Sequence, residues 1–166
     1  MPIIAPEIAC HPEDLLATVP IHVPPRSWRV VQTLARQEKS LGRDLLQRNV
    51  PFYLPLLPRH LSYRGRKAVS YSPLFSGILF CYANESERQI CFETRRAVAI
   101  IEVADQAGLH DDLRRISAAL TEDRRGELPD SEWLFRRIYS LKANQPSCRQ
   151  RDSSERLPTQ VETFGR

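Results

Sequence analysis

The fold of this chain is decided by the stretch SPLFSGILFCY at residues 72–82. A proline and a glycine bracket a pair of large apolar residues, which is typical of a turn. The run GILFCY at residues 77–82 is continuously apolar, which predicts a strand buried on both faces in the middle of a sheet. The stretch either enters a buried strand through a turn or presents Leu74, Phe75 and Ile78 to a partner.

Two elements with different periods precede this stretch. Residues 28–34, WRVVQTL, are rich in β-branched and aromatic residues and predict a strand. Residues 35–49, ARQEKSLGRDLLQRN, carry apolar side chains on one helical face and charges on the other, which predicts an amphipathic helix. We expect the helix to end at Asn49, because Asn tolerates left-handed backbone and the nearby Pro51 cannot continue a helix.

A basic segment, YRGRK at residues 63–67, lies between this helix and the apolar strand. Its central glycine predicts the tip of a β-hairpin, with PRHLS and AVSYS as the two arms. Because the tip carries Arg64, Arg66 and Lys67, it cannot lie in a core. It is either a solubilising loop or a group of cations that reaches for phosphates, and we favour the second reading.

Three further elements complete the domain. Residues 84–96 predict a short helix that begins at Asn84, with acidic residues in its first turn. Residues 97–103, AVAIIEV, predict a strand, and residues 109–120, LHDDLRRISAAL, predict a helix that packs on the sheet. The order of elements therefore predicts a small α+β domain over residues 26–120.

The two ends of the chain differ from this domain in composition. Residues 1–25 hold six prolines, which predicts an extended and flexible leader, and they lack the regions of a secretory signal. Residues 121–166 are mostly polar, which predicts a disordered tail with one short helix at 131–142. No apolar run approaches the roughly 18 residues that span a membrane, so we expect a cytoplasmic protein without a membrane partner.

Positive charge is concentrated in one part of the chain. Between Arg26 and Tyr82 ten Lys and Arg residues stand against two acidic residues, a net charge of +8, whereas the whole chain has a net charge of +4. Such a concentration is expected of a surface that faces phosphates. The alternative is a solvated face without a partner.

Motifs for catalysis and metal binding are missing from the sequence. The four cysteines form no CxxC pair and have no histidines at ligand spacing, so we expect reduced, packed thiols and neither a metal nor another cofactor. No GxSxG, HExxH, GxGxxG or GxxxxGK[ST] motif occurs, and the four histidines are scattered. The sequence therefore predicts a binding protein and not an enzyme.

Residues 27 to about 120 resemble the N-terminal domain of the NusG/RfaH family of transcription elongation and antitermination factors. The resemblance is carried by an ordered set of motifs: a first strand opening on Trp28, a helix with RQEK, NVPFYLP, the basic hairpin YRGRK, PLFSGILF where the family has PLFPGYLF, and ETRRAVAIIEV. It implies a central antiparallel sheet flanked by helices, the plait of this family's N-terminal domain.

The resemblance also implies partners. An apolar patch would grip the clamp helices of RNA polymerase, and its candidates are Phe75, Ile78, Phe80 and Gln32. The basic helix and hairpin would lie near upstream or non-template DNA, and their candidates are Arg36, Arg64, Arg66 and Lys67. Bound as a monomer across the polymerase cleft, the domain would suppress pausing through differential binding of the paused and active states, without chemistry.

Two features depart from the family pattern. Ile78 stands where the family has tyrosine, so an aromatic contribution of about 0.5–1.5 kcal/mol to the polymerase contact would be lost. Residues 121–166 contain no KOW motif, which is explained either by a divergent replacement or by a truncated or frame-shifted reading frame.

Three functions therefore remain open. An elongation or antitermination factor reduced to its polymerase-binding domain predicts an exposed apolar patch on the sheet edge beside Phe75 and Ile78. A plain nucleic-acid-binding α+β module predicts that both are buried and that only basic side chains act. The third reading is a folded remnant that has no partner.

Overall fold

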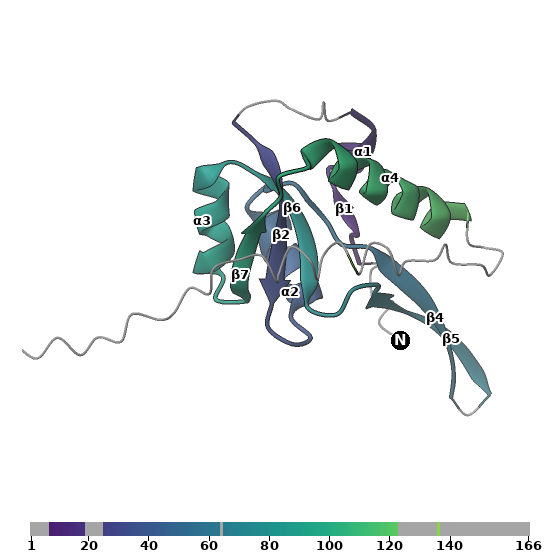
Figure 1. Ribbon diagram of the computed structural model, residues 1–166. Helices are drawn as coiled ribbons and strands as arrows, with labels where there is room; N and C mark the ends of the chain where they lie inside the picture. The colour runs from purple at the N-terminus through teal and green to yellow at the C-terminus, as the bar shows by residue number, and fades with distance from the viewer. Residues whose placement is uncertain (1–6, 19–24, 64, 123–135, 137–166) are drawn as a thin grey trace, which may run out of the picture.

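The centre of the molecule is a five-stranded antiparallel sheet with the strand order β1-β3-β6-β2-β7 (Figure 1). The computed structural model describes residues 7–18, 25–63, 65–122 and 136. The strands of this sheet are β1 (Cys10–His11), β2 (Ser27–Thr33), β3 (Phe52–Tyr53), β6 (Ile78–Ala83) and β7 (Ala97–Glu102). A second, two-stranded sheet consists of β4 (Leu56–Tyr63) and β5 (Arg66–Pro73).

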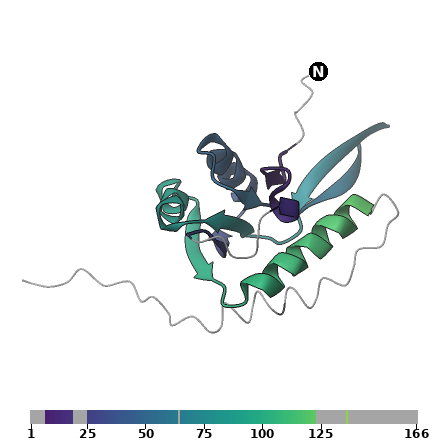
Figure 2. The same ribbon diagram turned by 90° about the horizontal axis from the view of Figure 1, so that it is seen from above.

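Helices cover both faces of the central sheet. They are α1 (Leu15–Thr18), α2 (Glu38–Gln47), α3 (Glu85–Glu93) and α4 (Gln106–Glu122). The helix α4 lies along one face, and α2 and α3 lie on the other (Figure 2). The predicted α+β class, with an antiparallel sheet flanked by helices, is confirmed.

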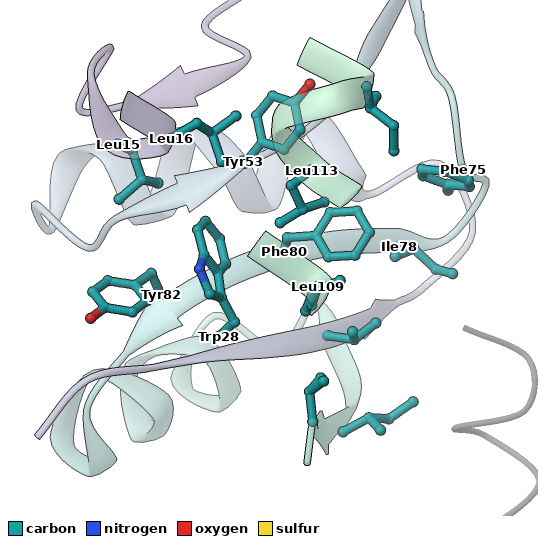
Figure 3. Packing of buried hydrophobic residues seen from close by; sticks show 14 residues of the cluster. Leu15, Leu16, Trp28, Tyr53, Phe75, Ile78, Phe80, Tyr82, Leu109 and Leu113 are labelled. Carbon is teal, nitrogen blue, oxygen red and sulfur yellow. The ribbon is translucent and has the colours of Figure 1, made fainter. Parts of the chain in front are cut away.

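The strand β6 is buried at every position, as its continuous apolar run predicts. Its side chains alternate between two cores. Phe80 and Tyr82 face α4 and pack against Trp28 of β2 (Figure 3). Leu79 and Cys81 face the other way, toward α2 and α3. Because β6 lies between β2 and β3, neither of its edges is free.

The helix boundaries follow local chemistry. Asn84 caps α3 by accepting a hydrogen bond from the amide of Glu87, whose carboxylate in turn accepts from the amide of Asn84, a capping box. Asn49 ends α2 in the left-handed region, with φ +55°, as predicted. The start of α2 differs from the prediction, since Arg36 takes φ +61° and the helix begins at Glu38.

A glycine in the middle of α2 lets the helix approach the sheet closely. A Cβ atom on Gly42 would lie 3.2 Å from the ring of Phe52 in β3, closer than side chains normally pack. Glycine costs about 1 kcal/mol of helix propensity relative to alanine. The close packing of α2 on Phe52 that glycine permits offsets this cost. Leu41 and Leu45 on the same face are fully buried.

The N-terminal segment is folded at Cys10–Thr18, so the extended leader predicted there is wrong for these residues. The strand β1 pairs with β3, and α1 inserts Leu15 and Leu16 into the core on the α4 side (Figure 3). These elements are too short to show a period in the sequence, and tertiary contacts form them instead. The predicted helix at 131–142 and the rest of the tail lie outside the described residues, apart from Arg136.

Candidate functional site

The hairpin formed by β4 and β5 projects from the body of the molecule (Figure 1). Its strands pair from Leu56↔Pro73 to Tyr63↔Arg66, and Gly65 at the turn has φ +76°. The predicted tip is therefore confirmed. Leu61 and Val69 are each 52% exposed on the arms, because no other element of the described structure covers them.

The nucleic-acid candidates fall into two groups along this hairpin. Arg66 and Lys67 begin β5 at the tip, and Arg64 is outside the described residues. Arg36 is exposed in the turn before α2 and lies at the base, where it lines the same hollow as Arg59. Because a strand rises by about 3.4 Å per residue, the tip lies about 14 Å beyond Arg59. A single bound nucleic-acid strand would have to extend along the hairpin to contact both the cations at the tip and those at the base.

Ion pairs neutralise part of the basic stretch. Acids from distant segments hold Arg26, Arg29, Arg43 and Arg48, through Glu87, Glu85 with Glu102, Glu7 and Glu93 respectively. No acidic side chain among the described residues pairs with the remaining described cations whose side chains are placed, Arg36, Lys39 and Arg59. The net charge of the stretch therefore overstates its unpaired positive charge, and the unpaired cations whose side chains are described lie at the hairpin base.

Arg29 shows how firmly such a pair is held. The residue is 8% exposed, and its guanidinium donates to Glu102 of β7 at 3.1 Å and to Glu85 of α3 at 3.2 Å. This arginine ties β2 to two neighbouring elements and is not available to a phosphate. Glu85 keeps a pKa below its ordinary value, because it also accepts a hydrogen bond from Arg88.

The apolar candidates for a polymerase patch are not exposed. Phe75 and Ile78 are each 1% exposed and Phe80 is fully buried, so an exposed patch beside them cannot consist of their own side chains, and their burial agrees with the nucleic-acid-module reading. Phe75 meets Phe80 edge to face with ring centroids 6.0 Å apart, and both lie in the core that α4 covers (Figure 3). Phe75 and Ile78 are buried because their side chains pack into this core. Gln32, opposite Ile78 on β2, is half-buried.

A different pair of apolar side chains is exposed beside these candidates. Leu34 follows β2 and is 50% exposed, and Val98 of β7 is 54% exposed. The Leu34 amide donates to the carbonyl of Arg96, two residues before Val98, at 2.9 Å. Leu34 and Val98 therefore lie at the same end of the β2–β7 pair. Neither residue was predicted as part of the site from the sequence, although an apolar residue directly after a strand, Leu34, was a signal.

The described residues contain no group of three side chains that could hold a metal ion, and no helix among them is long and apolar enough to cross a bilayer. Cys81 packs as a small apolar residue, with its sulfur 3.9 Å from that of Cys91 in α3. The hydrogen bond with Cys91 and burial both raise the pKa of Cys81. A neutral, buried thiol is a poor nucleophile.

Residues 26–118 match the family described as "Transcription termination factor nusG". The chain belongs to the NusG family. The matched segment runs from just before β2 into α4 and so contains the hairpin and the body of the domain. No curated protein matches the chain.

Membership of the NusG family gives the chain a general role in transcription. NusG-family proteins are transcription factors without enzymatic activity, and they typically interact with RNA polymerase. Residues outside the match include β1, at one edge of the sheet, and α1, which packs on the α4 side.

Proposed function

We propose that this NusG-family chain is a transcription elongation or antitermination factor that binds RNA polymerase and nucleic acid at once. The family match over residues 26–118 carries the proposal, because the matched segment includes strands β2, β3, β6 and β7 of the central sheet and the basic hairpin. The factor acts as a monomer in the cytoplasm, without a cofactor. It suppresses pausing or termination by binding the active state of the polymerase more tightly than the paused state.

The polymerase contact, with the clamp helices, lies at the end of the sheet around Gln32. Phe75, Ile78 and Phe80 support this surface from beneath, since their side chains are buried. Leu34 and Val98, each about half exposed and at the same end of the β2–β7 pair, supply the apolar area beside Gln32. Exposed apolar side chains that gather at one end of a sheet are a common mark of partner surfaces.

The nucleic-acid contact is made by Arg36 at the hairpin base and by Arg66 and Lys67 at its tip, together with Arg64, which is outside the described residues. Each phosphate that these cations neutralise releases condensed counterions from upstream duplex or non-template DNA. The logarithm of affinity is then expected to fall with the logarithm of salt concentration, with a slope of about −0.9 for each phosphate contact on duplex DNA.

Co-purification with RNA polymerase tests the proposal, and the burial of Ile78 determines which variants are informative. A lysine at a buried position would unfold the domain, so loss of binding would say nothing about the surface. We expect the double variant Leu34→Glu/Val98→Glu to lose polymerase. Ile8→Glu is the matched control, because Ile8 is a similarly exposed apolar residue at the N-terminal segment.

Retention of polymerase by the double variant would refute the surface, and no binding by the unaltered chain would refute the family-level role. The second candidate function is a stand-alone nucleic-acid-binding module. The burial of Phe75 and Ile78 favours it, since that reading expects no exposed patch there. DNA binding without any polymerase binding would select the second function.

A further inference from the structure

A hollow of about 460 Å³ lies between the first turn of α2 and the base of the hairpin. Residues from three separate segments line it: Arg36, Glu38, Lys39, Arg59, Tyr71, Ser72, Pro73 and Ser76. Its volume falls within the range of about 300–1,000 Å³ that is typical of sites for small ligands.

The free positive charge described above converges on this hollow. Arg36, Lys39 and Arg59 all line it, and none has an acidic partner among the described residues. The one carboxylate in the lining, Glu38, is 5% exposed and accepts a hydrogen bond from the amide of Gly77 at 2.5 Å. Three cations against one committed carboxylate leave a charge of about +2, which matches a dianion.

One hydroxyl group in the lining is also unused. The hydroxyl oxygen of Ser72 is buried and has no hydrogen-bond partner among the described residues. A buried hydroxyl without a partner is unfavourable, and a rotamer change can turn it toward a ligand oxygen. Gln37 makes no side-chain cap at the start of α2, and Glu38 in the first turn already offsets part of the positive potential of the helix N-terminus, so the unpaired cations supply most of the positive potential in the hollow.

The rim of the hollow carries an aromatic ring. Tyr71 is 42% exposed and lines the hollow beside Ser72 and Pro73. An exposed tyrosine beside arginines is a platform on which a nucleobase can stack while its phosphate meets the cations.

We propose that this hollow binds a phosphate monoester carried by a nucleoside, either a free mononucleotide or the phosphorylated 5′ end of a strand. A monoester carries a charge of about −1.5 to −2 at neutral pH, which the charge of the lining matches better than the single charge of a backbone diester. The inference shares only Arg36 with the proposed function and otherwise rests on residues to which that function assigns no role.

The test is titration of the full chain with 5′-AMP, followed by isothermal calorimetry, with adenosine as the matched ligand. We expect AMP to bind at least about tenfold more tightly than adenosine, because the charge-assisted hydrogen bonds are made to the phosphate. Arg59→Gln and Ser72→Ala should each weaken AMP binding several-fold. Arg48→Gln, which changes a half-exposed arginine outside the lining and outside the proposed nucleic-acid contact, is the control and should leave AMP binding unchanged.

A second arm separates the two sources of the phosphate. An oligonucleotide with a 5′-phosphate is compared with the same oligonucleotide bearing a 5′-hydroxyl, by fluorescence anisotropy. Preference for the phosphorylated end, or for AMP alone, supports the proposal and names the source. Equal binding of both oligonucleotides with no difference between AMP and adenosine overturns it. Polymerase co-purification is unaffected by that outcome, so failure of the pocket and failure of the proposed function are distinguishable.

Discussion

Removal of the Glu38 carboxylate is expected to loosen the turn that leads into β6. Glu38 stands in the first turn of α2, is 5% exposed, and accepts the amide hydrogen of Gly77 at 2.5 Å. A hydrogen bond to a charged group contributes about 1.5–3 kcal/mol, and a carboxylate in the first turn gains a further 0.3–1 kcal/mol or so from the helix dipole. We therefore expect Glu38→Ala to lower the free energy of unfolding by about 2–3 kcal/mol.

Glu38→Gln keeps an acceptor for the Gly77 amide and loses only the charge, so a smaller loss of about 1 kcal/mol is expected. Both variants are measured by urea denaturation, followed by far-UV circular dichroism, with equal m-values as the check on two-state unfolding. Glu93→Ala is the control. Its carboxylate meets Arg48 at 2.7 Å with both side chains about half exposed, so its removal should cost at most about 1 kcal/mol. A Glu38→Ala variant as stable as Glu93→Ala would refute the reasoning.

Two further predictions concern the turn and the core. Gly77→Ala should lower the free energy of unfolding by about 1–2 kcal/mol, because Gly77 has φ +72°, which is unfavourable for a residue with a side chain. The added methyl group itself meets only ordinary contacts. Urea denaturation measures the change, and an unchanged midpoint would contradict the prediction. Stability should also fall as pH drops below about 6.5, because burial, with a smaller effect of Arg114, lowers the pKa of His110, whose Nδ1 accepts the Trp28 indole hydrogen at 3.2 Å. The folded state favours the neutral His110 ring. The stabilisation that this provides is therefore fully present above the pKa of the unfolded state, and it is lost as the pH falls from there toward the lower pKa of the folded state. His110→Gln should show a smaller decrease between pH 7.5 and pH 5.5, and an equal decrease would exclude His110 as the cause.

Local patterns in the sequence were sufficient for the body of the fold. The apolar run of β6 predicted its burial, and Asn84 predicted the start of α3, because each depends on a few adjacent residues. The strand β1 and the helix α1 could not be predicted, since partners on β3 and α4 form them. Short elements of this kind carry too little periodic signal.

The candidate site was less predictable than the fold. Phe75 and Ile78 would look the same in sequence whether a helix or a partner protein covered them, and the packing of the α4 side decided that they are buried. The hollow at the hairpin base joins residues from the turn before α2, from β4 and from β5 with the following turn. Only the tertiary structure brings these segments together. The sequence likewise could not predict which cations are unpaired, because the acids that pair with Arg26, Arg29, Arg43 and Arg48 come from distant segments.

The position of β2 in the sheet has a consequence during synthesis on the ribosome. This strand is the first of the matched domain to be made, yet its two neighbours, β6 and β7, are made much later. At about 5–20 residues per second, β2 waits several seconds for the roughly 70 residues that complete its pairing. The hairpin, in contrast, closes as soon as its arms emerge. A nascent chain of this protein therefore exposes an apolar, unpaired strand for seconds, which makes it a natural client of ribosome-bound chaperones.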